Sequence, residues 1–442
     1  MSWDGVVDAV LAVQVTSTAA SVIFIVGSAA GIAVLAIRRH RRWLLIGLAS
    51  TACAALLLLG ATGIVVEKIW RPFPDPLPAS VYLWLGVAMF GAALGVGRWI
   101  VRRRDRCRVG AGAAVLTSIV VVMLCAAGAI NAVYDRYPTV RSVLGLETYR
   151  TVAFDTLPAP LPAGQAPSID QWTPPVDLPA TGAVTSVTIP GVVSGFSARQ
   201  ARIYLPPAYF AEPRPDLPVL VLLAGQPGSP DDWLVGGRLA EIMNAYTAKH
   251  RGLAPLVVVA DGTGGEFDNP LCVDSPRGNA ATYLGVDVPQ WVRTHLQADP
   301  DPRAWAVGGL SYGGTCALQL ATTRPEVYPT FLDLSGQAEP TLADKPTTIR
   351  EVFGGDTEAF ARNNPADLLA RNRYPDSAGA FVVGAQDNDY RAGIEHLAAA
   401  AQAAGMDVHL TELPGSHSFE VWSAGLEQEL PWLSHRLGLD SP

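Results

Sequence analysis

Four stretches of this 442-residue chain carry almost no charge and are each long enough to cross a bilayer. A membrane span needs about 20 apolar residues, and lipid leaves the backbone no hydrogen-bond partner outside a helix. The stretches are residues 15–37, 43–66, 81–101 and 109–133, and Arg98 alone interrupts the third. A cleaved signal peptide has a single short apolar core. We therefore expect residues 1–137 to form a permanent membrane domain of four transmembrane helices.

The composition agrees with a chain that lies partly in a membrane. Hydrophobic residues make up 49% of the chain, charged residues make up 16%, and the mean hydropathy is +0.24. The four stretches hold no acid or histidine at mid-membrane, where ionisable side chains would indicate a transport path. The sequence therefore favours anchoring over transport.

Arginine clusters predict the orientation of the membrane domain. One cluster, residues 38–42, separates the first two stretches, and another, residues 102–108, separates the third and fourth. The positive-inside rule places both clusters in the cytoplasm, so the N-terminus and everything after Asp135 should lie outside. Residues 1–137 have a net charge of +7 and the remainder has −15, and this distribution does not suggest nucleic-acid binding.

A proline-rich segment follows the membrane domain. Prolines recur between residues 157 and 179 with little hydrophobic periodicity. Such segments are extended and semi-rigid. We expect residues 138–182 to be a linker that lets an extracytoplasmic domain stand off the bilayer.

Beyond the linker, strand-like and helical patterns alternate. This alternation indicates an α/β fold, with a mostly parallel sheet covered by helices on both faces over residues 183–437. The predicted strands are 183–189, 201–205, 219–223, 256–260, 304–307, 330–334, 380–383 and 408–413. The predicted helices are 237–249, 281–297, 312–322, 366–371, 394–404 and 417–437.

A G-x-S-x-G motif, Gly309 to Gly313, lies between a predicted strand and a predicted helix. In this setting a serine sits on a strained turn, and glycines occupy the flanking positions where a Cβ would clash. Gly309 and Gly313 are these glycines. The motif predicts that Ser311 is a nucleophile.

A nucleophilic serine needs a base and an acid that orients the base. Six of the seven histidines fall in the first arginine cluster, on helices or within a strand, whereas His417 follows the last strand on a loop. The acid should follow the strand that ends at Val383, where Asp387 is favoured over Asp389 because Asp389 begins the next helix. The order Ser311, Asp387, His417 is the one found in α/β hydrolases.

An oxyanion hole needs two backbone N–H groups near the nucleophile. Tyr312, the residue after Ser311, supplies one. The glycine-rich loop after the strand 219–223 supplies the other, and Gln226 is the predicted donor because Pro227 has no N–H.

These motifs together resemble the putative-esterase family of α/β hydrolases, which includes esterase D, feruloyl esterases and actinobacterial mycolyltransferases. The resemblance covers about residues 183–436 and rests on the oxyanion loop ending at Trp233, the serine motif, Asp387 and the Pro-Gly-x-His run ending at His417. It implies a serine esterase of α/β-hydrolase fold. Many members have His-Gly where this chain has Ala224 and Gly225, so their substrate preference is not transferred.

Cys272 and Cys316 lie in stretches that resemble actinobacterial members of this family. On an oxidising cell exterior they would form a disulfide, and the alternative is two buried free thiols. No cysteine or histidine spacing in the chain suits a metal, and no cofactor is indicated.

We therefore expect a multi-pass membrane protein whose extracytoplasmic domain hydrolyses carboxylic esters. Tethering favours membrane or cell-envelope lipid esters, such as aminoacyl-phospholipids or glycolipids. One alternative is an acyltransferase of mycolyltransferase type, decided by a cap at residues 337–373. A second is a non-catalytic binding domain. The sequence leaves the oligomeric state open.

Overall fold

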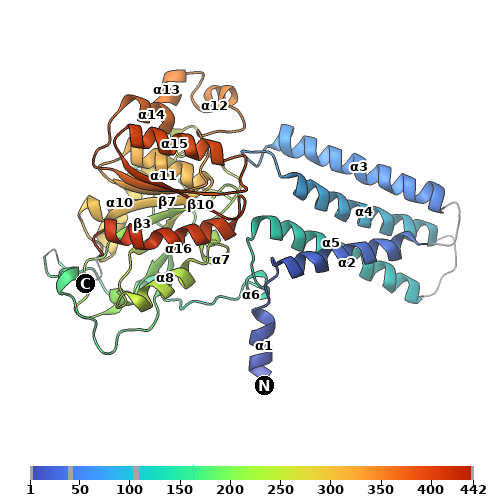
Figure 1. The fold of residues 1–442 in the computed structure, drawn as a ribbon, viewed down its shortest axis with the longest axis horizontal. Helices are drawn as coiled ribbons and strands as arrows, with labels where there is room; N and C mark the ends of the chain where they lie inside the picture. Colours follow the sequence, from blue (N-terminus) through green and yellow to red (C-terminus); the bar gives the residue numbers. More distant parts are fainter. Residues whose placement is uncertain (1–2, 38–42, 103–108, 163, 440–442) are drawn as a thin grey trace. The chain divides into compact units, whose positions relative to one another are not determined.

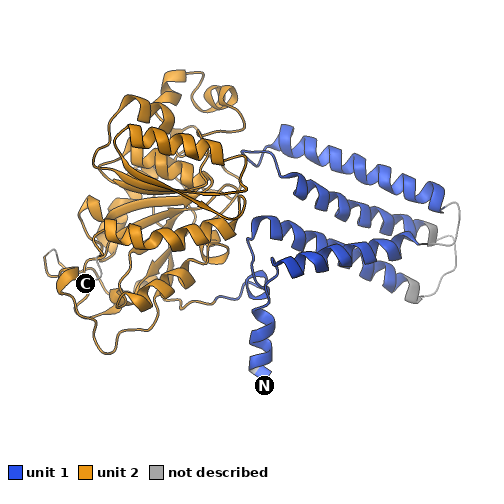
Figure 2. Cartoon of the chain, in the orientation of Figure 1, with its two compact units in different colours: residues 1–147 blue, residues 148–442 orange. Residues whose placement is uncertain are grey.

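The computed structural model describes residues 3–37, 43–102, 109–162 and 164–439. The chain divides into two units, residues 1–147 and residues 148–442 (Figure 2). The arginine clusters from which the orientation was predicted, residues 38–42 and 103–108, lie outside the described residues.

Unit 1 is a bundle of helices (Figure 1). Its helices are α1 (Trp3–Leu11), α2 (Thr18–Ala36), α3 (Leu48–Ile64), α4 (Ala79–Arg102), α5 (Val109–Tyr134) and α6 (Val140–Val143), with π-helical turns at Trp43–Gly47 and Val65–Trp70 around α3. Among the described residues, four segments are long and apolar enough to span a membrane, namely Thr18–Ala36, Trp43–Trp70, Ala79–Ile100 and Gly112–Tyr134. Arg98, the charge within the third span, donates to the carbonyl oxygen of Ile37 at 2.9 Å, just past the end of α2.

Unit 2 is built on an eight-stranded sheet. The strands lie in the order β1-β2-β4-β3-β7-β8-β9-β10, and all neighbours from β4 to β10 are parallel, while β1 and β2 pair antiparallel. Their bounds are β1 (Ala183–Val187), β2 (Ala201–Leu205), β3 (Val219–Leu223), β4 (Leu256–Ala260), β7 (Trp305–Leu310), β8 (Thr330–Leu334), β9 (Ala378–Gly384) and β10 (Asp407–Leu413). The predicted fold class is confirmed.

Alternate residues of each central strand pack into two separate cores. In β3, Val219, Val221 and Leu223 face one core, while Leu220 and Leu222 face the other. This follows from the two-residue period of a strand, and it explains why buried strands read as continuous apolar runs. The helices therefore cover both faces of the sheet (Figure 1).

The first core is covered by α10, α11, α14 and α15, and the second by α7, α8 and α16. The helices of unit 2 are α7 (Asp231–Val235), α8 (Leu239–Lys249), α9 (Ala280–Thr282), α10 (Val288–His295), α11 (Tyr312–Thr323), α12 (Lys345–Val352), α13 (Thr357–Ala361), α14 (Pro365–Arg371), α15 (Arg391–Ala403) and α16 (Phe419–Arg436). A short hairpin of β5 (Asp274–Ser275) and β6 (Gly278–Asn279) precedes α9.

The single helix expected over residues 281–297 is divided. A π-helical segment, Tyr283–Asp287, separates α9 from α10. Pro289 lies in the first turn of α10 and has no N–H to donate to the preceding turn, which accounts for the change of helical pitch there.

The proline-rich segment does not stand apart from the sheet domain as the extended spacer that its composition predicted. Thr151 bridges Val184 of β1, and Phe154 contacts the Trp291 ring with centroids 5.3 Å apart. Trp172 is 2% exposed and its indole nitrogen donates to the carbonyl oxygen of Pro213 at 2.9 Å. Apolar residues between the prolines thus bind the segment to the sheet domain, and the segment belongs to unit 2.

The covalent connection between the two units is short. The backbone N–H groups of Gly145 and Leu146 still bond back to the α6 turn, while Tyr149 already packs against a core of unit 2. Only Glu147 and Thr148 lie between these contacts, and a fully extended chain gains at most about 3.6 Å per residue. The connection is therefore far shorter than the predicted linker over residues 138–182.

Candidate active site

The turn from β7 into α11 holds Ser311 in a strained conformation. Its φ of 53° and ψ of −119° lie where residues with a Cβ are rarely found, at a cost on the order of 1 kcal/mol or more. The Ser311 N–H donates to the carbonyl oxygen of Leu334 at 2.8 Å, which fixes the turn to β8. A Cβ at Gly313 would lie 2.3 Å from the carbonyl oxygen of Leu223, so this position requires glycine.

Three polar side chains form a continuous chain of hydrogen bonds. His417 Nε2 lies 2.9 Å from Ser311 Oγ, and His417 Nδ1 lies 2.8 Å from Asp387 Oδ2. An ionised carboxylate can only accept, so Nδ1 carries the proton toward Asp387, and Nε2 accepts from the serine hydroxyl. The Asp387 side chain is 3% exposed and the His417 side chain 23%, so a substrate can approach the histidine but water scarcely reaches the acid.

Two loops at the carboxyl ends of neighbouring parallel strands bring the acid and the histidine together. The N–H of Gln386 donates to the carbonyl oxygen of Gly415 at 2.8 Å, and the N–H of Gly415 donates to Gln386 Oε1 at 2.7 Å. These bonds join the loop after β9 to the loop after β10. Asp389, the alternative acid, is exposed, and the hydrogen bond of His417 Nδ1 is with Asp387.

Two aromatic side chains hold the His417 ring in place. Tyr390 stacks on it with centroids 3.9 Å apart and an interplanar angle of 17°. Trp422, on α16, meets the same ring edge-on at 4.8 Å and 88°. The imidazole is thus restrained by packing as well as by its hydrogen bonds.

The predicted oxyanion loop lies beside Ser311, the predicted nucleophile. A Cβ at Gly225 would lie 3.5 Å from the Ser311 Cβ, so the loop runs beside the serine and a methyl group at this position would contact it. Gln226 is 7% exposed, and its Nε2 donates to the carbonyl oxygen of Phe267 at 3.1 Å. The loop after β4 therefore supports the loop after β3 beside Ser311.

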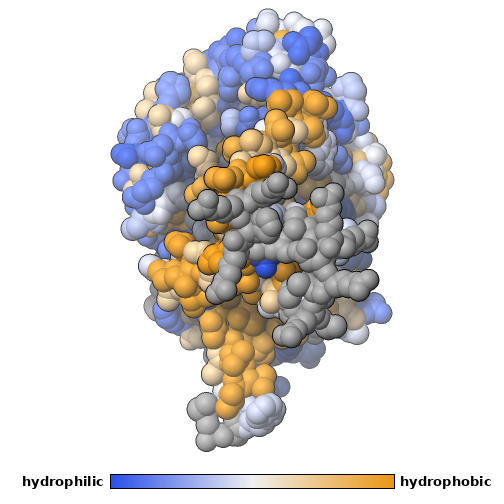
Figure 3. All heavy atoms as spheres, turned by 90° about the vertical axis from the view of Figure 1, so that its right-hand side faces the viewer, coloured by the Kyte–Doolittle hydropathy of each residue, from blue (hydrophilic) through white to orange (hydrophobic). Residues whose placement is uncertain are grey.

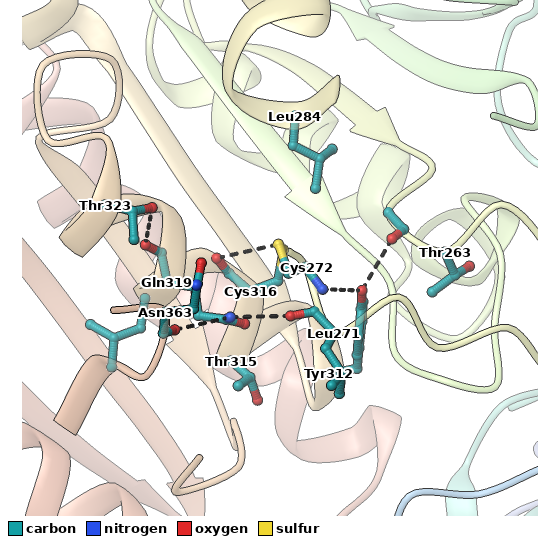
Figure 4. Close-up of a disulfide and its surroundings, with 12 residues drawn as sticks. Thr263, Leu271, Cys272, Leu284, Tyr312, Thr315, Cys316, Gln319, Thr323 and Asn363 are labelled. Atoms are coloured by element: carbon teal, nitrogen blue, oxygen red, sulfur yellow. Dashed lines mark hydrogen bonds between the residues drawn. A yellow bond between two sulfur atoms is a disulfide. The ribbon is translucent and has the colours of Figure 1, made fainter. Parts of the chain in front are cut away.

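A disulfide joins Cys272 to Cys316 and links the loop after β4 to helix α11 (Figure 4). Next to it, the Tyr312 hydroxyl accepts from the Cys272 N–H at 3.0 Å and donates to the carbonyl oxygen of Gly262 at 3.1 Å. Burial raises the pKa of Tyr312, so its hydroxyl keeps the proton that it donates. On α11, Gln319 donates through Nε2 to the carbonyl oxygen of Leu271 at 3.1 Å. These contacts hold the first turns of α11, which follow Ser311, against the loop after β4.

Asp333 is a buried carboxyl group next to the turn that holds Ser311. It pairs in register with Gly309, and its Oδ1 accepts from the Gly336 N–H at 2.7 Å. A Cβ at Gly314 would lie 2.3 Å from this oxygen, so the first turn of α11 rests directly on the carboxyl. Burial raises the pKa of Asp333 to about 7, although the Gly336 bond favours the ionised form.

Asp333 should make the stability of unit 2 depend on pH. Its pKa in the folded chain is about 7 and its ordinary value is 3.8, so between these pH values the folded state binds more protons than the unfolded state. Stability should therefore fall as the pH rises from 4 to 7, by at most about 4 kcal/mol from this group. An asparagine side chain mimics the protonated acid, so Asp333→Asn should flatten this slope while matching the parent chain near pH 4. The free energy of unfolding of both chains can be measured at each pH by urea denaturation in detergent, with proteolysis of unit 2 as the readout of unfolding. Equal slopes of this free energy against pH in the parent chain and in Asp333→Asn would contradict the expectation.

No metal centre is evident in the part of the chain that the structure describes, since no group of three or more His, Cys, Asp or Glu side chains there could hold an ion. Three residues of the site were not predicted from the sequence, namely Tyr390, Trp422 and Asp333. Tyr390 and Trp422 reach His417 from two different elements, so only the tertiary structure shows the contact. Asp333 lies within an apolar strand, and an acid in such a run is the one sign that could have indicated it.

Comparisons with known proteins place both the catalytic-domain region and the whole chain among relatives. Residues 197–433 match the family described as "Putative esterase". An uncharacterized protein of Corynebacterium glutamicum is 38% identical over 438 residues, which cover 96% of this chain and 97% of the relative.

Two solved structures share the fold of unit 2. A ferulic acid esterase superposes with a TM-score of 0.51 at 19% identity, covering 58% of this chain and 99% of its own. An S-formylglutathione hydrolase from Agrobacterium tumefaciens gives 0.50 at 19% identity, covering 59% and 97%. At 19% sequence identity the similarity to these two structures shows a shared fold only.

Proposed function

Because this chain belongs to the putative-esterase family of α/β hydrolases, we propose that it is a serine ester hydrolase that works through a triad of Ser311, His417 and Asp387. The observation that carries this proposal is the unbroken hydrogen-bond chain from Ser311 Oγ through the His417 ring to the buried Asp387, at 2.9 and 2.8 Å. The strained backbone of Ser311 supports it, because such strain gathers at reactive groups.

The reaction follows from the direction of these bonds. Ser311 Oγ attacks the ester carbonyl while His417 Nε2 takes its proton, and Asp387 stabilises the imidazolium that forms. Backbone N–H groups of Gln226 and Tyr312 stabilise the oxyanion. His417 then gives the proton to the leaving alcohol, and water, activated by the same nitrogen, releases the acyl group from Ser311.

We propose that this domain works outside the cytoplasm on esters of membrane or cell-envelope lipids. Four apolar helices suggest a membrane anchor, and the arginine loops favour an extracytoplasmic hydrolase. Only Glu147 and Thr148 separate the contacts within unit 1 from those within unit 2, so the tether between anchor and catalytic domain would be short. Aminoacyl-phospholipids and glycolipid esters are the substrates that such a tethered enzyme would meet.

A fluorophosphonate probe and a defined acyl donor test the proposal together. The full chain, reconstituted in vesicles, should be labelled by the probe and should release free acid from an ester lipid in the same vesicle. Transfer of most acyl groups to an added sugar or lipid alcohol would identify an acyltransferase instead. Absence of both labelling and turnover would indicate a binding domain.

Tyr390 should contribute to the rate through its stack on His417. Removing the ring by Tyr390→Ala frees the imidazole, and aromatic pairs contribute about 0.5–1.5 kcal/mol, so kcat should fall up to about tenfold with little change in KM. Tyr390→Phe keeps the stack and should retain most of the activity. Steady-state kinetics with a soluble ester measure both variants. An equal loss in the two would assign the effect to the hydroxyl group rather than to the stack.

A further inference from the structure

Helix α1 presents an apolar face that the described structure leaves uncovered. Trp3, Val7 and Val10 are 80%, 40% and 54% exposed. Their spacing of four and three residues places them on one side of the helix. Asp8 lies on another side, where it pairs with Arg141 at 3.0 Å. The helix is therefore amphipathic.

Contacts with the segment around α6 fix α1 in place. Gln14 forms an antiparallel bridge with Thr139, and the N–H of Val15 donates to the carbonyl oxygen of Pro138 at 2.9 Å. Together with the Asp8–Arg141 ion pair, these bonds tie both sides of the turn after α1 to the end of the bundle. The direction of α1 is therefore set by unit 1 itself.

The helix runs across the direction of the spans. Figure 1 shows α1 projecting sideways from the end of the bundle where α2 begins and α5 ends. Figure 3 looks along the spans from their far ends, and hydrophobic residues cover the side of the projecting helix that faces the viewer. The apolar face of α1 is thus turned toward the side along which the four spans extend.

We propose that α1 lies flat in the surface of the bilayer, with Trp3, Val7 and Val10 inserted at the boundary between lipid headgroups and acyl chains. The occupant of the apolar face is the lipid of the membrane that the four helices span. An amphipathic helix that runs across the direction of the spans, with its apolar side toward the bilayer interior, has the geometry of an interfacial helix. Tryptophan favours this boundary because its ring is apolar and its N–H is polar.

This position has a consequence for the catalytic domain. Through Asp8–Arg141 and the Gln14–Thr139 bridge, α1 holds α6 at the level of the headgroups. The connection to unit 2 begins directly after α6. The helix therefore fixes the height of the point from which the hydrolase is tethered, and the inference rests on the membrane anchoring in the proposed function.

Spin labels on α1 test this arrangement. In a full-length background with Cys53, Cys107 and Cys125 replaced by serine, a nitroxide is attached at Val7→Cys or Val10→Cys. The chain is reconstituted in nanodiscs of phosphatidylcholine and phosphatidylglycerol. Ala9→Cys is the matched control, because Ala9 is exposed on a different side of the same helix.

Labels at positions 7 and 10 should collide more with oxygen, which concentrates in lipid, than with a water-soluble nickel chelate. The label at position 9 should show the reverse. Equal nickel access at all three positions would overturn the interfacial position of α1. A different result would be that both reagents fail to reach positions 7 and 10, and that the labels show spin–spin broadening which disappears when unlabelled chain is added. This result would overturn the proposal and would mean that a second copy of the chain covers the apolar face of α1.

Alkaline carbonate extraction separates this inference from the anchoring on which it rests. A chain that remains in the membrane pellet, yet shows water-exposed labels at positions 7 and 10, contradicts only the placement of α1. A chain that is released into the supernatant contradicts membrane anchoring itself, whatever the labels show.

Discussion

Replacing Ser311 with alanine is expected to abolish both fluorophosphonate labelling and ester hydrolysis. The hydroxyl lies 2.9 Å from His417 Nε2, and no acyl-enzyme can form without it. Loss of a triad nucleophile typically lowers kcat by on the order of 10⁴-fold to 10⁶-fold, and the oxyanion hole and substrate binding supply the residual rate. Release of free acid from a soluble ester, measured on the detergent-solubilised chain, gives the ratio directly.

The matched control is Ser423→Ala. Ser423 is a buried serine on α16, where its hydroxyl lies 3.4 Å from the carbonyl oxygen of Glu420. This variant tests whether the loss of any buried serine hydroxyl disturbs the fold, and it should keep labelling and turnover. A Ser311→Ala chain that still reacts with the probe would mean that another residue is the nucleophile.

Replacing Asp387 with asparagine is expected to lower kcat by about 10³–10⁴-fold. The amide is nearly isosteric with the carboxylate, so the fold should be preserved. Its NH₂ group can donate toward His417 Nδ1, however, which favours the tautomer whose Nε2 carries the proton and cannot accept from Ser311. The carboxylate that stabilises the imidazolium is also lost. Single-turnover acylation by a chromogenic ester isolates this step.

Asp389→Asn is the natural comparison, because the two carboxylates are two residues apart on the same loop. Asp389 is exposed, whereas Asp387 contacts the histidine directly. We expect the Asp389 variant to acylate within a few-fold of the parent rate. A large loss in Asp389→Asn with a small one in Asp387→Asn would reverse the assignment.

The sequence predicted most of the strands because each central strand is a buried apolar run. The bounds of β2, β3, β4 and β8 match the prediction to the residue. The proximity of Ser311, Asp387 and His417 was also predictable, because each follows a strand and the carboxyl ends of parallel strands meet at one edge of the sheet.

Two features depended on tertiary contacts that a linear pattern does not contain. The prolines of the segment after the last span predicted an extended, semi-rigid linker, but Phe154 and Trp172 pack into unit 2. The aromatic support of His417 by Tyr390 arises only when the loop after β9 meets the loop after β10. Local composition therefore led to the wrong interpretation of the linker, and it contains no information about the contact between Tyr390 and His417.

The two-residue connection at Glu147 and Thr148 also bears on how the proposed ester hydrolase would be assayed. The proposed catalytic domain, joined to the proposed membrane anchor by so few residues, would search the plane of one membrane rather than a volume of solution. Its rate should then follow the mole fraction of ester lipid in that membrane, and diluting the substrate with inert lipid should slow turnover even when the bulk amount is constant. Ester lipid supplied in separate vesicles should remain largely intact.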